Sequence, residues 1–284
     1  LQIRRVGDVA VSPDGTWLVT VERNGTTRVL TADGAERSAH AWDHPLGAAA
    51  AVAVAPCGTW LATAHDVMRG QIELWDTDGT SRAVFDSGHT YPQTTGLAIA
   101  SCGTWLACTG FDGLALLNAD GTPKPGFDPG GFSESLNDVA ISPDGTWLAT
   151  AGENGVLLWS LDGSWDRLVT DIDFPGRVAI SPDGTWLATT DVSGFVVLWN
   201  ADGTLLTELT DHAGIVADVA FSPDGAWLAT SGLDKTVCLW DTSTLRCVTS
   251  LRTDSELGRI AWFPTGDRLA VCGERGLYVF DLRT

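Results

Sequence analysis

Three polar residues in the last third of the chain, His212, Thr230 and Asp234, are of the types that a hydrolase uses as base, nucleophile and orienting group. The neighbouring sequence predicts neither an exposed nucleophile nor an oxyanion hole. Polar groups that are buried in a stack of β-sheets need hydrogen-bond partners simply to be tolerated. A structural role is therefore favoured over catalysis for these residues, and we predict that the chain is not an enzyme.

Aspartates ahead of glycine, for example in Asp76-Thr77-Asp78-Gly79, resemble the start of a calcium-binding loop. The later ligands of such a loop and its bidentate glutamate are missing at the required spacing. A tight turn explains the same residues. The turn is favoured, and we expect no metal and no other cofactor.

Tryptophan recurs at one position, directly after a glycine-containing turn. The six copies are Trp17, Trp60, Trp105, Trp147, Trp186 and Trp227. Amphipathic rings that repeat in this way cover the seams between neighbouring sheets more often than they stack on sugars or bases. Seam packing is favoured, and a carbohydrate-binding ring stays open as the alternative.

These tryptophans belong to a motif that recurs along the whole chain, with SPDGTWLAT at 142–150 as its clearest copy. The copies are marked by their central glycines, which are Gly15, Gly58, Gly103, Gly145, Gly184, Gly225 and Gly266. Successive glycines are 39 to 45 residues apart. A period near forty indicates an array of like supersecondary units.

Each copy has the pattern of a β-hairpin. Pro143 and Asp144 favour a turn, and Gly145 accepts the positive φ that ends it. An alternating strand precedes the turn and Trp147 opens the returning strand. A third strand follows, as in VLLWSLDG at 156–163, and a short apolar run supplies a fourth. This pattern predicts an all-β fold, a seven-bladed β-propeller of four-stranded antiparallel blades.

The repeats resemble those of the WD-repeat family from end to end. Its signature dipeptide and near variants of it stand at Trp75-Asp76, Trp159-Ser160, Trp199-Asn200 and Trp240-Asp241. The Gly-His or Asp-His pair of the family is matched by Asp43-His44, Gly88-His89 and Asp211-His212. The resemblance implies that His212, Thr230, Asp234 and Trp240 form a hydrogen-bonded relay. Such a relay would fasten the loop before a blade's first strand to the strands outside it.

We interpret residues 1–284 as a single propeller domain. Its predicted blades are roughly 1–40, 41–86, 87–131, 132–170, 171–210, 211–252 and 253–284. The second blade carries an insertion at 65–70, and prolines and glycines forbid regular structure in the long turn 122–131. The residues at the N-terminus could complete the last blade only as its outermost strand, while β-structure of the first blade begins at the innermost position. The stretch from Ile3 to Val6 reaches about 10 Å at best, whereas the outermost and innermost strands of a blade lie roughly 14 Å apart. We therefore expect a last blade of three strands, or one that holds only a stub of a fourth.

The chain is acidic, with 36 acidic and 17 basic residues and a net charge of −19. This charge would repel a phosphate backbone, which argues against nucleic acid or an anionic membrane as partner. The chain has no apolar run long enough to span a bilayer. The composition suggests a GC-rich bacterial genome.

The six cysteines show neither a zinc-type spacing nor a disulfide framework. Cys57 and Cys102 occupy the same turn position in two repeats, and so lie in different blades. A bridge between Cys238 and Cys247 across a hairpin is conceivable. Reduced thiols of a cytoplasmic protein are favoured over that bridge.

One repeated position carries charges among small and apolar neighbours, seven residues before each central glycine. The residues there are Asp8, Ala51, Gly96, Asp138, Arg177, Asp218 and Arg259. Because this position begins the innermost strand, we expect these side chains to surround one mouth of the central channel. The aspartates would accept an arginine or an amino terminus of a peptide, and the arginines would pair with carboxylates. The alternative is a set of solvated strand ends.

We predict a non-catalytic platform for protein or peptide recognition at one face, a sensor or scaffold module of a larger bacterial protein. The sequence resembles the tails of bacterial STAND-type signalling NTPases, in which the propeller is a sensor or docking part. The phosphate-binding pattern G-x(4)-G-K-[ST] is not found in these residues, and a further domain is expected upstream. The alternative, a propeller enzyme such as a metal-dependent hydrolase or lactonase, would need histidine and carboxylate ligands at the channel. The charged ring contains no histidine.

Overall fold

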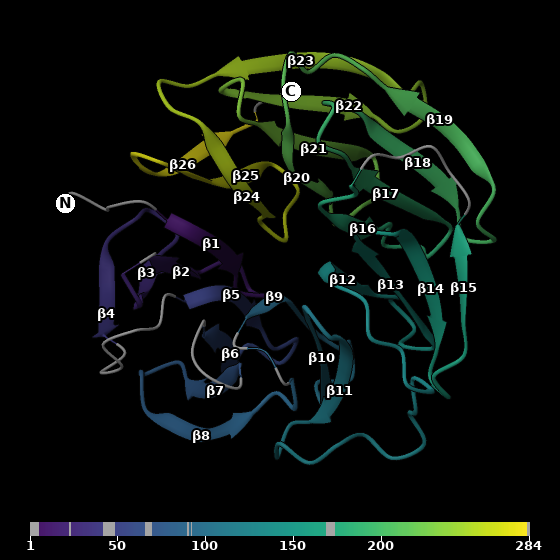
Figure 1. The fold of residues 1–284 in the computed structure, drawn as a ribbon. Helices are drawn as coiled ribbons and strands as arrows, with labels where there is room; N and C mark the ends of the chain where they lie inside the picture. Colours follow the sequence, from purple (N-terminus) through teal and green to yellow (C-terminus); the bar gives the residue numbers. More distant parts are fainter. Residues whose placement is uncertain are drawn as a thin grey trace.

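The computed structural model describes residues 6–22, 24–41, 49–65, 70–89, 91, 93–168 and 174–282. Regular structure in these residues consists of twenty-six strands, which form seven antiparallel sheets. Figure 1 shows the sheets arranged one after another around a central axis. The prediction of an all-β, seven-bladed propeller is confirmed.

Every sheet is built from strands that follow one another along the chain. Blade one consists of β1 (Val6–Val11), β2 (Trp17–Glu22), β3 (Thr26–Thr31) and β4 (Glu36–Ala41). Blade two consists of β5 (Ala49–Val54), β6 (Trp60–His65), β7 (Gln71–Asp76) and β8 (Ser81–Asp86). Blade three consists of β9 (Thr94–Ile99), β10 (Trp105–Gly110) and β11 (Gly113–Asn118). Blade four consists of β12 (Leu136–Ile141), β13 (Trp147–Gly152), β14 (Gly155–Ser160) and β15 (Trp165–Leu168).

The remaining blades continue the same order. Blade five consists of β16 (Val178–Ile180), β17 (Trp186–Thr190), β18 (Val196–Asn200) and β19 (Leu205–Leu209). Blade six consists of β20 (Val216–Phe221), β21 (Trp227–Gly232), β22 (Thr236–Asp241) and β23 (Arg246–Arg252). Blade seven consists of β24 (Leu257–Trp262), β25 (Arg268–Gly273) and β26 (Gly276–Asp281). The expectation that the last blade has three strands is confirmed for its described residues.

Blade three departs from the four-strand prediction. Beside β11 the chain makes a single bridge, between Leu117 and Pro123, and the Lys124 N–H donates to the Leu116 carbonyl at 2.8 Å. The segment then turns away through Pro125 and Gly126. Because proline has no N–H to donate, this segment cannot continue a ladder of hydrogen bonds.

The repeated turn has the conformation that its sequence predicts. Gly145 has a φ of 69°, and its N–H donates to the Ser142 carbonyl at 2.8 Å. The Asp144 carboxylate accepts hydrogen bonds from the Ser142 hydroxyl and from the backbone N–H of Thr146. These bonds close the link between the first two strands and place Trp147 at the start of the second.

The apolar core lies at the seams between blades. Each core cluster joins side chains of two neighbouring blades, as where Trp17 and Val29 of blade one pack with Val52 and Leu61 of blade two. Five of the tryptophans that follow the turns belong to these clusters, namely Trp17, Trp60, Trp105, Trp147 and Trp227. Trp17, Trp60 and Trp105 are only 4 to 6 % exposed, so they cannot form a ring of open sugar-stacking platforms.

The ring closes where blade one meets blade seven, and Figure 1 shows β1 beside β24. Val9 and Leu18 pack with Phe263 and Cys272 in one buried cluster. The Arg268 guanidinium donates to the Ala32 carbonyl at 2.8 Å across the same seam. No strand is exchanged between these two sheets in the part of the chain that is described. Leu1–Ile3, and residues 66–69 of the predicted insertion, lie outside the described residues.

Two further sequence-based expectations concern membrane spans and disulfides. Among the residues described here, no helix is long and apolar enough to cross a membrane. All six cysteines are free thiols. Cys238 pairs with Ser250 and Cys247 with Trp240 across β22 and β23, so the two cysteines are not directly opposite each other in the hairpin.

Candidate binding site at the channel mouth

The five charged residues of the predicted ring lie at the start of innermost strands that surround the channel. Asp8, Asp138 and Asp218 stand at the third position of β1, β12 and β20. A bulge precedes each aspartate, because the strand pairing shifts between Val6 and Asp8 and at the equivalent places in the other two blades. A bulge re-aims the side chain that follows it. We define these three residues together with Arg177 and Arg259 as the channel ring.

Each aspartate of the channel ring joins its blade to the next one. The Asp8 carboxylate accepts the Val52 N–H at 2.8 Å, the Asp138 carboxylate accepts the Val178 N–H at 3.1 Å, and the Asp218 carboxylate accepts the Ile260 N–H at 2.7 Å. In every case the donor is the residue that follows the ring position of the next blade. The aspartates therefore serve as hydrogen-bonded links between innermost strands. Sequence analysis did not find this role.

Arg259 reaches across the channel to all three aspartates. Its nitrogens lie 3.2 Å from an Asp138 oxygen, 3.5 Å from Asp218 and 3.7 Å from Asp8. The Arg259 side chain is 13 % exposed and the three carboxylates are 7 to 9 % exposed. We expected these aspartates to bind an arginine of a ligand. The structure instead places Arg259 of the chain itself beside them.

Arg177 is the most open member of the channel ring. Its side chain is 27 % exposed, and Nη1 lies 3.6 Å from an Asp138 oxygen and donates to the Asn137 carbonyl at 3.2 Å. A guanidinium has five N–H donors, so these contacts leave donors for a carboxylate ligand. Arg177 is therefore the ring residue best placed to touch a partner.

Burial is the largest single influence on the pKa values of Asp8, Asp218, Arg177 and Arg259. It raises the pKa of Asp8 and raises that of Asp218 to about 6, although the Arg259 charge acts in the opposite direction. Burial lowers the pKa of Arg177, and repulsion from Arg259 adds to this effect. For Arg259, burial acts to lower the pKa, but the attraction of the three carboxylates outweighs it and the pKa is raised. The cluster is thus a low-dielectric ion-pair network and not a set of solvated strand ends.

Two hollows open at this end of the channel and share Arg177 and Ala217. One has a volume of 330 Å³ and is lined by Arg259, Glu256 and Leu233 among others. The other has a volume of 440 Å³ and is lined by polar groups such as Asn137 together with Ile215. Arg177 thus stands where the two hollows meet.

Exposed apolar side chains gather on the face that carries this mouth. The loops before first strands and those between second and third strands lie on one face, because the strands of each blade alternate in direction. Of the thirteen large hydrophobic residues that are exposed in the described part of the chain, seven are in these loops, namely Tyr91, Phe111, Phe174, Val192, Phe195, Ile215 and Leu233. The other six are on outer strands. We call this side the mouth face, and the opposite side, which carries the Ser-Pro-Asp-Gly turns, the turn face.

The four residues of the predicted relay in blade six are hydrogen bonded in series. His212 Nδ1 lies 3.0 Å from an Asp234 oxygen and His212 Nε2 lies 2.8 Å from the Thr230 hydroxyl. The Trp240 indole donates to the same hydroxyl at 3.0 Å. The histidine and threonine are buried. With each polar group engaged inside the blade, this arrangement resembles a structural brace and not a catalytic triad facing a cleft.

Parts of the relay recur in blades where sequence analysis did not expect them. The indole of a third-strand tryptophan donates to a second-strand threonine from Trp75 to Thr63, from Trp159 to Thr150 and from Trp199 to Thr189. The signal was present in the repeat itself, since the threonine of WLAT is three residues after the turn tryptophan. In blade three, a cysteine, Cys108, stands at the threonine position and Leu117 replaces the tryptophan.

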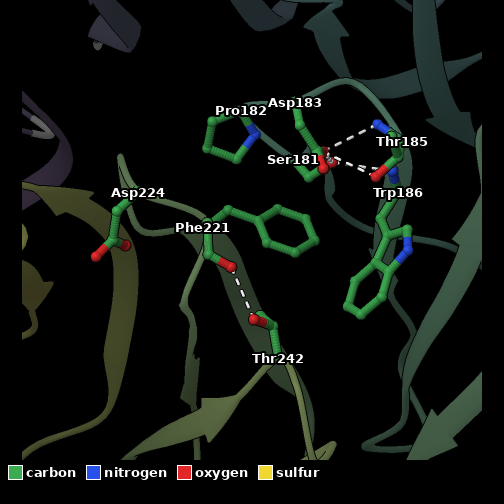
Figure 2. Close-up of a pocket in the computed structure, with 9 residues that line it drawn as sticks. Ser181, Pro182, Asp183, Thr185, Trp186, Phe221, Asp224 and Thr242 are labelled. Atoms are coloured by element: carbon green, nitrogen blue, oxygen red, sulfur yellow. Dashed lines mark hydrogen bonds between the residues drawn. The ribbon is translucent and has the colours of Figure 1, made fainter.

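A further hollow of 440 Å³ lies on the turn face between blades five and six. Figure 2 shows the Trp186 and Phe221 side chains within it, with Asp183 and Asp224 near its rim. The Asp183 carboxylate accepts hydrogen bonds from Ser181 and Thr185 of its own turn, as Figure 2 shows. These carboxylates shape their turns. Within the described ranges no group of three or more His, Cys, Asp or Glu side chains is placed to hold a metal ion.

The comparison with protein families agrees with this geometry. The family described as "WD domain, G-beta repeat" matches residues 4–30, 130–160, 155–200 and 203–241, which fall in blades one, four, five and six. Among curated proteins, no sequence matches the chain. The repeat matches and the ring of seven sheets identify the chain as a WD40-repeat β-propeller. Propellers of this family commonly bind proteins or peptides and are typically non-catalytic.

Proposed function

We propose that this chain is a non-catalytic platform that binds a protein or peptide on its mouth face, with Arg177 as the anchor for a carboxylate of the partner. The observation that carries the proposal is a pair of hollows that share one open arginine and are each lined by an exposed apolar side chain, Leu233 in one and Ile215 in the other. Protein interfaces combine an apolar centre with a few placed polar groups, and arginine is enriched in them.

The remaining members of the channel ring support this site from below. Arg259 forms ion pairs with the carboxylates of Asp8, Asp138 and Asp218. These ion pairs hold the innermost strands at their spacing. Asp138 also approaches Arg177 at 3.6 Å, which orients the guanidinium. In the proposed site, Arg177 contacts the partner, and the aspartates and Arg259 position Arg177 without contacting the partner themselves.

Ile215 and Leu233 supply the apolar part of the proposed site. They are 41 % and 39 % exposed, and they lie in neighbouring loops because the Leu233 N–H donates to the Ile215 carbonyl at 2.9 Å. Arg177 borders both hollows, of which Leu233 lines one and Ile215 lines the other. A peptide segment with an apolar residue next to a carboxylate fits this pair of features. A bacterial, cytoplasmic setting and a covalently joined upstream domain stay predictions from the sequence.

A library of random peptides, displayed and then resynthesised with a fluorophore, tests the proposal by fluorescence polarisation. Peptides selected by the chain should bind Arg177→Ala at least tenfold more weakly, because a charge-assisted pair contributes about 1.5 to 3 kcal/mol. Ile215→Ser combined with Leu233→Ser should weaken binding as well. Arg246→Ala and Val248→Ser remove an exposed arginine and an exposed valine from β23, far from the mouth, and should bind as the unaltered chain does.

Two results would overturn this proposal. Selected peptides that bind Arg177→Ala and the serine variants with full affinity would place recognition elsewhere on the propeller. Turnover in a panel of ester, lactone and glycoside substrates, assayed with added divalent metals, would favour the hydrolase alternative.

A further inference from the structure

The third residue of the repeated turn is an aspartate in four blades and a cysteine in two. The aspartates are Asp14, Asp144, Asp183 and Asp224, and the cysteines are Cys57 and Cys102. Each aspartate accepts a backbone N–H from the residue two positions later at 3.0 Å. Each also accepts the hydroxyl of the serine two positions earlier at 2.5 to 2.7 Å. The turn is therefore a cradle of donors that favours a negative charge.

The donors of the turn lower the pKa of its aspartate. Donation from the Ser12 hydroxyl and from Thr16 lowers the pKa of Asp14, and the equivalent donors lower the pKa of the other three aspartates. These carboxylates are almost fully exposed, so the effect comes from the donors of the turn and not from burial. The same backbone geometry recurs at the cysteines, since Gly58 and Gly103 have a φ of 68°, as Gly15 does.

The two thiols lie in this cradle. Cys57 Sγ is 3.1 Å from the Thr59 hydroxyl, and Cys102 Sγ is 3.1 Å from the Thr104 hydroxyl. These threonine hydroxyls, together with the threonine N–H groups, lower the pKa of both cysteines. Alanine replaces the serine of the turn in both blades, so the threonine alone supplies the side-chain donor.

Both thiols are exposed on the turn face, and their turns are neighbours in the ring. A Cβ built on Gly103, the residue after Cys102, would lie 3.9 Å from Pro56 Cδ, the residue before Cys57. The positive charges of Arg82 and Lys124 further favour the thiolates of Cys57 and Cys102 respectively. A reagent in solution therefore meets two thiols on adjacent blades, each held by donors and near a cation.

The other four cysteines are opposite in character. Burial raises the pKa of Cys108 and of Cys238 to about 12, and it raises that of Cys272 as well. Cys247 is partly buried and its pKa is also raised by burial. The chain thus contains its own set of unreactive thiols for comparison.

We propose that Cys57 and Cys102 are a pair of reactive thiolates on the turn face that undergo reversible thiolation by low-molecular-weight disulfides. In this exchange the cysteine thiolate attacks one sulfur of a disulfide RSSR, the S–S bond of the reagent breaks, and a Cys–S–S–R bond forms as RS⁻ leaves. The disulfide reagent is the only oxidant, and an excess of RSH reverses the reaction. This site is separate from the mouth face and does not depend on the proposed function.

Labelling of the folded chain tests the proposal, with 5,5′-dithiobis(2-nitrobenzoate) and oxidised glutathione as the probes. We expect two fast thiols per chain and mass spectra that place the adducts on Cys57 and Cys102. The buried thiols of Cys108, Cys238 and Cys272 should react only after denaturant is added, and the partly buried Cys247 should react more slowly than the two turn cysteines. The rate of the fast phase, measured against pH, should titrate below the ordinary thiol value of about 8.5.

Variants that lack the threonine hydroxyl distinguish thiols that the turn activates from thiols that react only because they are exposed. Thr59→Val and Thr104→Val should each slow one fast thiol at pH 7 and move its pH profile upward. A rise of one in pKa cuts the thiolate fraction about tenfold, but the rate only about threefold, because the more basic thiolate is more nucleophilic. Thr185→Val removes the same hydroxyl from a turn that holds an aspartate, and should change neither rate. Cys57→Asp and Cys102→Asp restore the residue of the other turns, and should fold and lose one fast thiol each.

Three results would overturn the proposal. One is a folded chain in which Cys108, Cys238 or Cys272 reacts as fast as the two turn cysteines. Another is a pH profile for Cys57 and Cys102 at or above the ordinary thiol value. The third is a set of valine variants, folded by circular dichroism, whose rates and profiles equal those of the unaltered chain.

Discussion

Arg259 and Asp138 are 121 residues apart in sequence and touch across the centre of the propeller, with Arg259 Nη2 at 3.2 Å from Asp138 Oδ1. They belong to blades seven and four, which are not neighbours in the ring. Arg259 also approaches Asp8 of blade one and Asp218 of blade six. One side chain therefore ties four blades together, in a ring whose ends are also joined by packing between β1 and β24 and by the hydrogen bond from Arg268 to Ala32.

Removing this arginine should destabilise the propeller strongly. In Arg259→Ala the three aspartates would remain buried with Arg177 as the one remaining cation of the channel ring, and breaking a buried pair of this kind costs about 3 to 5 kcal/mol. Urea denaturation followed by tryptophan fluorescence measures the loss. Arg246→Ala, at an exposed position on β23, is the control and should change the free energy of unfolding by less than about 0.5 kcal/mol. Equal stability of the two variants would show that Arg259 is not a tie between blades.

Asp218 should make the stability of the chain fall as pH rises from about 4 to about 6. Its pKa is raised from 3.8 to about 6, mainly by burial, so in this window the folded chain binds more protons than the unfolded chain. The free energy of unfolding then decreases with pH, by about 3 kcal/mol for this group alone. The contribution is fully present below pH 4 and lost above pH 6.

The variant Asp218→Asn isolates that effect. Asparagine keeps an oxygen for the Ile260 N–H but does not titrate. The free energy of unfolding of the unaltered chain minus that of the variant, from urea denaturation at pH 4, 5, 6 and 7, should therefore fall as pH rises, and taking this difference removes the contributions of all other acids. Two parallel curves would contradict the assignment of this titration to Asp218.

The positions of the charged ring residues could be predicted from the sequence, but their contacts could not. The period of the central glycines fixes seven blades and places Asp8 and Arg259 at the same level of the channel. It does not reveal that one long arginine side chain spans the channel, because that depends on the channel width and the bulges before the aspartates. It also does not reveal that the aspartates bond to the next blade. These contacts predict a loss of stability when Asp138 or Asp218 is replaced with alanine.

For the relay, too, the sequence predicts which residues take part but not all of the hydrogen bonds that they form. The sequence of blade six suffices to bring His212, Asp234 and Trp240 together, because each matches a position of the family's repeat. The recurring threonine of WLAT was equally visible, yet its bond to a tryptophan on another strand depends on strand register. That register pairs Leu228 with Trp240 and Thr230 with Cys238, which places the indole beside the hydroxyl. The third blade has three strands because prolines interrupt the segment after β11. These prolines, in 122–131, are visible in the sequence.

Two threonines at one position of the repeat should respond in opposite ways to loss of the hydroxyl. The Thr230 hydroxyl contacts His212 and the Trp240 indole, both buried. Thr230→Val leaves these groups without a partner and should cost about 1 to 3 kcal/mol. Thr20 is also fully buried, but its hydroxyl has no partner among the described residues. Thr20→Val should be neutral or stabilising, because valine has the same shape and no group to desolvate. Equal losses in the two variants, measured by urea denaturation, would contradict the role of the relay.

Gly96 should be intolerant of a side chain although Ala51, its counterpart in blade two, carries one. A Cβ built on Gly96 would lie 2.9 Å from the Asp138 Cα and 2.7 Å from the Thr109 hydroxyl oxygen. Blades three and four thus approach closely at this point, and the Asp138 backbone cannot withdraw without disturbing its bonds to Val178 and Arg259. Gly96→Ala should therefore destabilise the chain by about 1 to 3 kcal/mol.

Gly176→Ala is the matched control for this close approach. A Cβ there would come no nearer than 3.4 Å to any neighbour, the nearest atom being the Thr190 hydroxyl oxygen, and the backbone does not have a positive φ. Its free energy of unfolding should equal or slightly exceed that of the unaltered chain, since alanine lowers the entropy of the unfolded state. If Gly96→Ala were as stable as Gly176→Ala in urea, the seam between blades three and four would be looser than the contact of Gly96 with Asp138 requires.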